Sequence, residues 1–154
     1  MGIHKQRAME LFEQGYNCAQ ATLGAFCEDA GLPFETAIKL ASSMGGGMGR
    51  LREVCGALSG TFLAAGMMYG YTDPQAAEEK AEHYTRIQEL AREFREESGS
   101  ILCRELLALP EGPDDPTPEK RTEGYYRRRP CAQLVGLAAD LLEARMLKEQ
   151  EDAK

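Results

Sequence analysis

The stretch MGGGMGRLREVCGALSG, residues 44–60, places a cysteine in the most glycine-dense part of a chain that otherwise favours helix. Glycine lets a backbone bend into conformations that other residues avoid and lets neighbouring groups approach closely. Such a run is unfavourable inside a helix, so its presence around Cys55 indicates a functional site. The residues from Leu51 to Tyr69 are rich in Ala, Gly, Leu and Met. We expect them to form a central helix packed closely by others.

Helical spacing of apolar residues also predicts the structure on both sides of this stretch. One apolar stripe recurs every three or four positions through the first thirty residues, at Met9, Phe12, Tyr16, Ala19, Leu23, Phe26 and Ala30. Further helices are expected at 33–43, from Asp73–Pro74 to Ser98, at 101–109, and from Pro130–Cys131 onward. The proline-rich segment 110–118 is expected to be a loop.

No segment shows convincing strand alternation, so we expect an all-α fold. The length of 154 residues fits a single-domain helical bundle of five to seven helices over residues 1–154. Residues 148–154 form a polar tail that is expected to fray. We expect the helix from Asp73 to Ser98, which carries many charges, to lie along the outside of the bundle.

Composition excludes several classes of function. The chain is 43% hydrophobic and 28% charged, with no apolar run of membrane-spanning length, so membrane insertion is not expected. Its net charge of -7 opposes nucleic-acid binding. The one basic cluster, Arg127–Arg129, is interpreted as a solvated loop, with anion binding or thiolate stabilisation as the alternative. The first residues lack an export region, so we expect a cytoplasmic protein with reduced thiols.

Three of the five cysteines fall in the first turn of an expected helix: Cys18, Cys103 and Cys131. Helix starts are electropositive and favour an anion, so a thiolate placed there should have a lowered pKa. Cys55 fits the same pattern less firmly, because the glycines leave the start of its helix open. Cys27 lies nine positions after Cys18, on the opposite face of a continuous helix, and is interpreted as a buried core thiol.

The spacing of the metal-binding residue types excludes familiar sites. The sequence has no Cys-x-x-Cys pair, which argues against thioredoxin-like exchange and zinc ribbons, and no Cys-x-x-Cys-His for covalent haem. The two histidines, His4 and His83, have no partner at ligand spacing and are expected to be ordinary surface residues.

The motifs that carry this pattern resemble those of a named family. They are Asn17-Cys18-Ala19, the glycine run 45–49, Cys55-Gly56-Ala57-Leu58-Ser59-Gly60, Cys103-Arg104-Glu105-Leu106 and Cys131. Together they resemble the C_GCAxxG_C_C family of redox-active proteins over roughly residues 8–145, in the same order.

The resemblance implies four family cysteines, which fall on Cys18, Cys55, Cys103 and Cys131, with Cys27 outside the pattern. Members are similar to a domain of split-Soret cytochrome c, which implies an iron–sulfur or other metal centre. The haem part of that analogy does not apply, because the attachment motif is missing. Family genes near transporter genes imply a functional link to a membrane transporter, and the redox partner is unknown.

Three hypotheses of function remain open at this point. In the first, the four family cysteines converge as thiolate ligands of a metal or an iron–sulfur cluster, and Gly45, Gly46, Gly47 and Gly49 bring backbone amides near its sulfurs. In the second, two cysteine pairs, such as Cys18 with Cys55 and Cys103 with Cys131, cycle between dithiol and disulfide. In the third, the chain is a helical binding or adaptor module with buried structural cysteines. We expect the bundle to bring the helix starts that carry these four cysteines to one pole.

Overall fold

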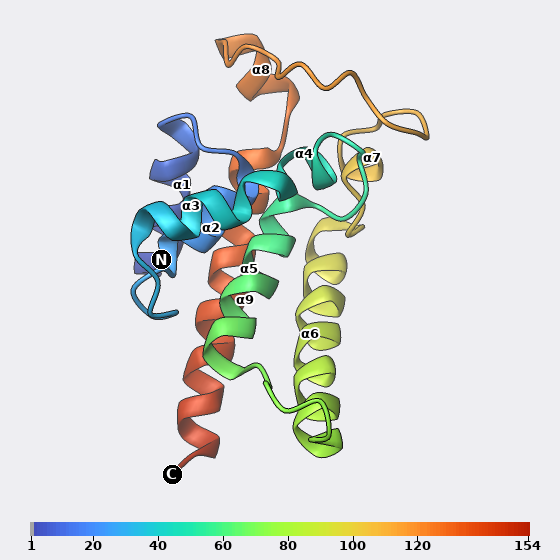
Figure 1. The fold of residues 1–154 in the computed structure, drawn as a ribbon. Coiled ribbons are helices and arrows are strands. Elements are labelled where there is room, and N and C mark those ends of the chain that lie inside the picture. The colour runs from blue at the N-terminus through green and yellow to red at the C-terminus, as the bar shows by residue number, and fades with distance from the viewer. Residues whose placement is uncertain (1) are drawn as a thin grey trace.

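The computed structural model describes residues 2–154 and confirms the all-α class. Six of its helices have eight residues or more, and short helices join them near one end of the molecule (Figure 1). In chain order the elements are α1 (Ile3–Glu13), α2 (Cys18–Ala25), α3 (Phe34–Ala41), the 3-10 turn η1 (Ser42–Met44), α4 (Gly45–Met48), α5 (Gly56–Tyr69), α6 (Ala77–Ser98), α7 (Cys103–Leu106), α8 (Glu123–Arg128) and α9 (Cys131–Asp152).

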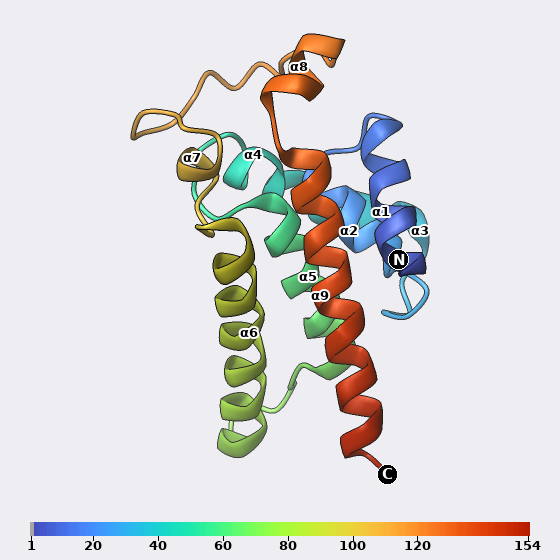
Figure 2. The ribbon, with the colours of Figure 1, turned by 180° about the vertical axis from the view of Figure 1, so that it is seen from behind.

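Helix α5 is the centre of the bundle, as its composition predicts. Its first turns are buried on all sides, from Gly56 to Thr61, and its small side chains let neighbouring helices approach closely. Helix α2 packs along one side of α5 and α9 along another. Viewed from behind, α9 runs the length of the molecule beside α5 (Figure 2).

The N-terminal helices cover the other side of α2. Helices α1 and α2 are separate, because the chain turns at Gly15, which has φ of +107°. Asn17 then caps α2: its side chain accepts a hydrogen bond from the backbone N–H of Gln20, and the Gln20 side chain accepts one from the N–H of Asn17. This reciprocal cap fixes Cys18 as the first residue of α2.

The charged helix α6 lies along the outside, against α5 and α9, as expected (Figure 1). It buries His83, Leu90 and Phe94 and exposes most of its other residues. Two ion pairs tie it to the last helix, Arg86 with Glu149 at 2.6 Å and Arg145 with Glu89. They cross between helices and therefore set how α9 lies against α6.

Several expected boundaries are wrong. The central helix begins at Gly56, not Leu51, and residues 51–55 are not helical; Val54 forms a β-bridge with Leu102. Helix α6 begins at Ala77, because the Asp73 side chain caps a separate turn by accepting from the N–H of Gln75.

The C-terminal part of the chain differs from expectation in three ways. The helix expected at 101–109 is only Cys103–Leu106, and α8 follows the predicted proline-rich loop although no helix was expected there. Third, α9 continues to Asp152, so most of the polar tail 148–154 is helical, and its fraying stays a prediction. Among residues 2–154, no helix is long and apolar enough to cross a membrane.

Candidate functional site

Each of the four family cysteines lies at the N-terminal end of a helix. Cys18, Cys103 and Cys131 are the first residues of α2, α7 and α9, and Cys55 is the residue that precedes α5. The expected helix starts are therefore confirmed for the first three. For Cys55, which was assigned less firmly, the structure places the thiol directly at the start of the central helix.

The four cysteines line one cavity of about 290 Å³. It lies at the end of the bundle where α4, α7 and α8 gather (Figure 1). Gly45, Gly46 and Gly49 also line it, whereas Gly47 lies behind the wall, against Cys103. All five cysteines are free thiols. Within the part of the chain that the structure describes, no three His, Cys, Asp or Glu side chains are grouped closely enough to hold one metal ion.

The Cys-Gly-Ala-x-x-Gly motif works through the two glycines on one face of α5. A Cβ atom at Gly56 would collide with the sulfur of Cys18 and lie 2.8 Å from the Met44 carbonyl oxygen. A Cβ atom at Gly60 would collide with the side chain of Thr22. The motif therefore lets α2 approach α5 so closely that Cys18 lies beside the start of α5.

The glycine run reverses the chain beneath the cavity. Gly46, Gly47 and Gly49 have φ values of +68°, +69° and +55°, a region that favours glycine. The non-glycine residues Met48, Arg50 and Arg52 also have positive φ, which marks a strained stretch of the kind that gathers at functional sites. At Gly47 there is also no room for a side chain, because a Cβ atom would lie 2.7 Å from the Cβ of Cys103.

Backbone hydrogen bonds hold the segments that carry Cys55 and Cys103 together. The N–H of Cys55 donates to the Ile101 carbonyl at 2.8 Å, and the N–H of Cys103 donates to the Glu53 carbonyl at 2.6 Å. The β-bridge between Val54 and Leu102 lies between these two bonds. This short pairing brings together two thiols that are 48 positions apart in the sequence.

The expected lowering of the thiol pKa is wrong for three of the four cysteines. Burial raises the pKa of Cys18, of Cys55 and of Cys131, the last to about 12. The neighbouring thiols raise these values further, because each thiolate disfavours a second charge. Backbone N–H groups of Gly46 and Ala19 lower the pKa of Cys18, as a helix start should, but burial outweighs them. These thiols are therefore protonated at neutral pH.

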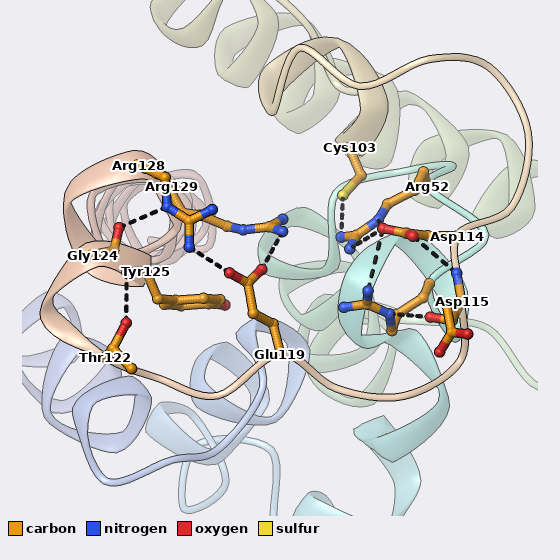
Figure 3. A network of polar contacts seen from close by, with 11 residues as sticks. Arg52, Cys103, Asp114, Asp115, Glu119, Thr122, Gly124, Tyr125, Arg128 and Arg129 are labelled. Atoms are coloured by element: carbon orange, nitrogen blue, oxygen red, sulfur yellow. Dashed lines mark hydrogen bonds and ion pairs between the residues drawn. The ribbon is translucent and has the colours of Figure 1, made fainter.

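Arginines are prominent in the cavity wall beside Asn17 and Ser42, and only Arg129 among them belongs to the basic cluster 127–129 that stands out in the sequence. Arg50, Arg52, Arg121 and Arg129 line the cavity, with Glu119 as the only carboxylate among the lining residues. Arg52 is 3% exposed and donates from its guanidinium to the Cys103 sulfur at 3.5 Å and to Asp114 at 2.9 Å (Figure 3). Cys103 and Asp114 lie 51 and 62 positions from Arg52, so no local sequence pattern could indicate these contacts.

The segment between α7 and α8 forms one side of the cavity and is fixed by ion pairs at both ends. Asp114 accepts from Arg50 and Arg52, and Glu119 accepts from Arg128 at 2.5 Å and Arg129 at 2.6 Å (Figure 3). The basic cluster 127–129 is thus only partly solvated. Arg129 is mostly buried, stacks over the Tyr125 ring, and its charge lowers the pKa of Cys131, although less than burial raises it.

Cys27 lies away from this site, as expected. It is buried and lines a second, separate cavity beside His4 and Phe34. The interpretation of Cys27 as a core thiol is therefore confirmed, and it offers a control for the other four.

The expectation of surface histidines is wrong for both residues. His4 stacks on the Phe26 ring at 4.1 Å, and its two ring nitrogens lie 2.6 Å from Glu143 and 2.8 Å from Asp29. His83 is 8% exposed, and its Nδ1 lies 3.0 Å from the Arg86 guanidinium. His4 therefore joins α1 to α9, whereas His83 contacts Arg86 within α6, and neither lines the cysteine cavity.

Comparison with known proteins agrees with this site. Residues 16–145 match the family described as "Putative redox-active protein (C_GCAxxG_C_C)". The chain belongs to this family, as the motifs indicate. A protein of Archaeoglobus fulgidus, described only as uncharacterized, is 26% identical over 154 residues, which cover 96% of this chain and 95% of that protein. No solved structure matches the chain.

Proposed function

We propose that this chain is a redox protein whose cysteines 18, 55, 103 and 131 are the thiolate ligands of an iron–sulfur cluster or a comparable metal group. The observation that carries this proposal is that four free thiols from four separate helix starts line one cavity. Cys27, which the family pattern leaves out, lies elsewhere. A packing role for the cysteines would not require the four to share a cavity.

The donor set fits such a group. Four cysteine thiolates are the usual ligands of an iron–sulfur cluster. The four thiols line a space of about 290 Å³, which has room for a group of several atoms. The N–H groups of Gly46 and Ala19, which face the Cys18 sulfur, are the kind of donor that adjusts the potential of a cluster.

The charges around the cavity also fit a thiolate-bound group. Arg50, Arg52, Arg121 and Arg129 line the wall with Glu119, and they outnumber the carboxylates even when Asp114, the partner of Arg50 and Arg52, is counted, although the whole chain has a net charge of -7. Positive side chains so placed stabilise the negative charge that the cysteines acquire when they lose their protons. When bound, the cluster would supply one-electron transfer. The protein would hold it, surround it with positive charge and shield it from bulk water.

The raised pKa values favour ligation over dithiol–disulfide exchange. Only the thiolate is nucleophilic, and burial keeps Cys18, Cys55 and Cys131 protonated at neutral pH. A metal overcomes this penalty because it displaces the proton and takes up the charge. An incoming disulfide offers no such compensation.

The test is metal and sulfide analysis with a visible spectrum of protein purified without oxygen. We expect stoichiometric iron and charge-transfer absorbance in the wild type and in Cys27→Ser. Single serine substitutions at 18, 55, 103 and 131 should each lower the iron content strongly. Cys27→Ser is the matched control, because it removes a thiol from the same chain but from a different cavity.

Two outcomes would contradict the proposal. Colourless, metal-free protein whose free thiols disappear in pairs on oxidation would support the dithiol hypothesis. Metal-free protein whose thiols do not respond to oxidants would support the adaptor hypothesis.

A further inference from the structure

We infer that Arg52 is a positioning residue for the redox centre: its guanidinium holds the Cys103 sulfur at the cavity wall and raises the reduction potential of the bound group. This inference rests on the proposed function and concerns a residue outside the cysteine and glycine motifs. It starts from the only hydrogen bond that a charged side chain makes to a cysteine sulfur among the described residues.

Hydrogen bonds hold the backbone of Arg52 in place. Its backbone has φ of +62°, and its carbonyl accepts from the N–H and the guanidinium of Arg104 at 3.3 Å each. The next residue, Glu53, pairs through its carbonyl with the N–H of Cys103. The backbones that carry the guanidinium and the sulfur are therefore held in register with each other.

The side chain is fixed at its far end too. Nε and Nη2 lie 3.3 and 2.9 Å from one carboxylate oxygen of Asp114, which leaves Nη1 to donate to the sulfur at 3.5 Å (Figure 3). A guanidinium that is 3% exposed would be strongly unfavourable without such partners. Asp114 and the Cys103 sulfur are thus the hydrogen-bond partners that stabilise this buried charge.

This arrangement has a defined effect on a redox centre. Hydrogen bonds and positive charge at a ligand sulfur stabilise the more negative, reduced state, so they raise the reduction potential. Arg50 provides a close comparison. It binds the same Asp114 oxygen at 3.2 Å and the Asp115 carbonyl at 2.5 Å, but makes no contact with a sulfur.

The first measurement needs no metal. In the metal-free protein, the alkylation rate of Cys103 by anionic iodoacetate is divided by its rate with neutral iodoacetamide, each followed by mass spectrometry at one pH. The thiolate attacks the carbon of either reagent and displaces iodide, and the two reagents have similar size, so the ratio of the rates reports the local charge. We expect Arg52→Gln to lower this ratio about fivefold, the effect of one nearby charge in water. Arg52→Lys should keep most of the wild-type ratio, and Arg50→Gln should lower the ratio less than Arg52→Gln does.

The second measurement is the midpoint potential of the loaded protein. We expect a more negative potential in Arg52→Gln, partial recovery in Arg52→Lys, and a smaller negative shift in Arg50→Gln, which removes a charge from the wall but no hydrogen bond to a sulfur. An Arg52→Gln variant whose alkylation ratio equals that of the wild type would overturn the inference. If Arg52→Gln does not fold, Arg52→Lys provides the test. A fall of about fivefold in the alkylation ratio of Arg52→Lys, which keeps the charge, would then overturn the inference. Wild-type protein without iron would overturn the proposed function alone, because the alkylation ratio still tests Arg52.

Discussion

At the scale of single residues, the site depends on places where a side chain is missing. Gly56 and Gly60 remove one Cβ atom each from the face of α5 that meets α2, and Cys18 and Thr22 occupy that space. Other residues of α5 are small as well, but these two glycines set the distance between the helices. The motif is therefore a packing requirement as much as a chemical one.

Gly56→Ala should destabilise the protein and displace the Cys18 sulfur. Its new methyl group would collide with Cys18 and with the Met44 carbonyl, and overpacking of this kind costs about 1–3 kcal/mol. Gly66→Ala is the matched control: it lies in the same helix, has nothing within 4 Å of the new Cβ, and should stabilise by about 0.5–1 kcal/mol. Urea denaturation measures both. Equal effects of the two substitutions would contradict this account of the motif.

His4 should make the stability depend on pH. Burial alone would lower its pKa, but the hydrogen bonds to Glu143 and Asp29 and their charges outweigh burial, so the pKa of His4 is raised above 6.5. A raised pKa in the folded state stabilises the protein fully below the unfolded value, and this contribution disappears as the pH rises through the folded value. The stability lost in His4→Gln should therefore be larger at pH 5.5 than at pH 8.5, by urea denaturation. A loss of stability in His4→Gln that grows with pH would contradict the raised pKa of His4.

At the scale of elements, the site is assembled from helix starts and one connecting segment. Asp114 fixes that segment by binding Arg50 and Arg52, and these two charges and its hydrogen bonds lower its pKa. The segment has little secondary structure of its own between α7 and α8. Its position against the cavity therefore depends on these ion pairs and on Arg121, which donates to the backbone carbonyls of Phe12 and Tyr16.

Asp114→Ala should release this segment. We expect faster tryptic cleavage after Lys120 and Arg121, severalfold above wild type, because local opening exposes the backbone to the protease. Glu111→Ala is the control, since Glu111 is exposed in the same segment and makes none of these ion pairs. Cleavage rates that do not differ between the two variants would show that the ion pairs do not hold the segment.

Sequence reasoning predicts elements of this kind when the signal is local. The Asn17 cap and Pro130 place Cys18 and Cys131 at helix starts, because caps depend on residues a few positions apart. The start of α5 was not predictable in the same way, since residues 52–55 are held outside the helix by pairing with residues 101–104. The contact of Arg52 with Cys103 likewise arises only from the tertiary fold.

At the scale of the whole molecule, burial decides the chemistry of the thiols. A helix start lowers a thiol pKa, and this local effect is present at Cys18. The fold, however, surrounds the cavity with packed helices, so desolvation dominates and the sign of the net shift is reversed. Local sequence gives the position of a thiol relative to a helix but not its depth in the protein.

Metal loading should therefore stabilise the folded chain in a pH-dependent manner. A group that binds only the native state at about a hundred times its Kd adds about 2.7 kcal/mol, which raises Tm by about 5–10 °C for a chain of this size. Ligation releases the protons of Cys18, Cys55 and Cys131, so binding strengthens as the pH rises. The Tm difference between loaded and metal-free protein should be larger at pH 8 than at pH 6. Calorimetry that gives a smaller difference at pH 8 would contradict the raised pKa values.

The pairing of the segments just before α5 and α7, around Val54 and Leu102, affects how the cavity could take up a bound group. Because backbone hydrogen bonds join these segments, the spacing between Cys55 and Cys103 is fixed without any bound group. Cys18 and Cys131 begin α2 and α9, and among the described residues they share no such backbone bonds with these segments. For the cluster proposed above, two ligands would therefore have a preset spacing, and the positions of the other two would depend on how α2 and α9 pack.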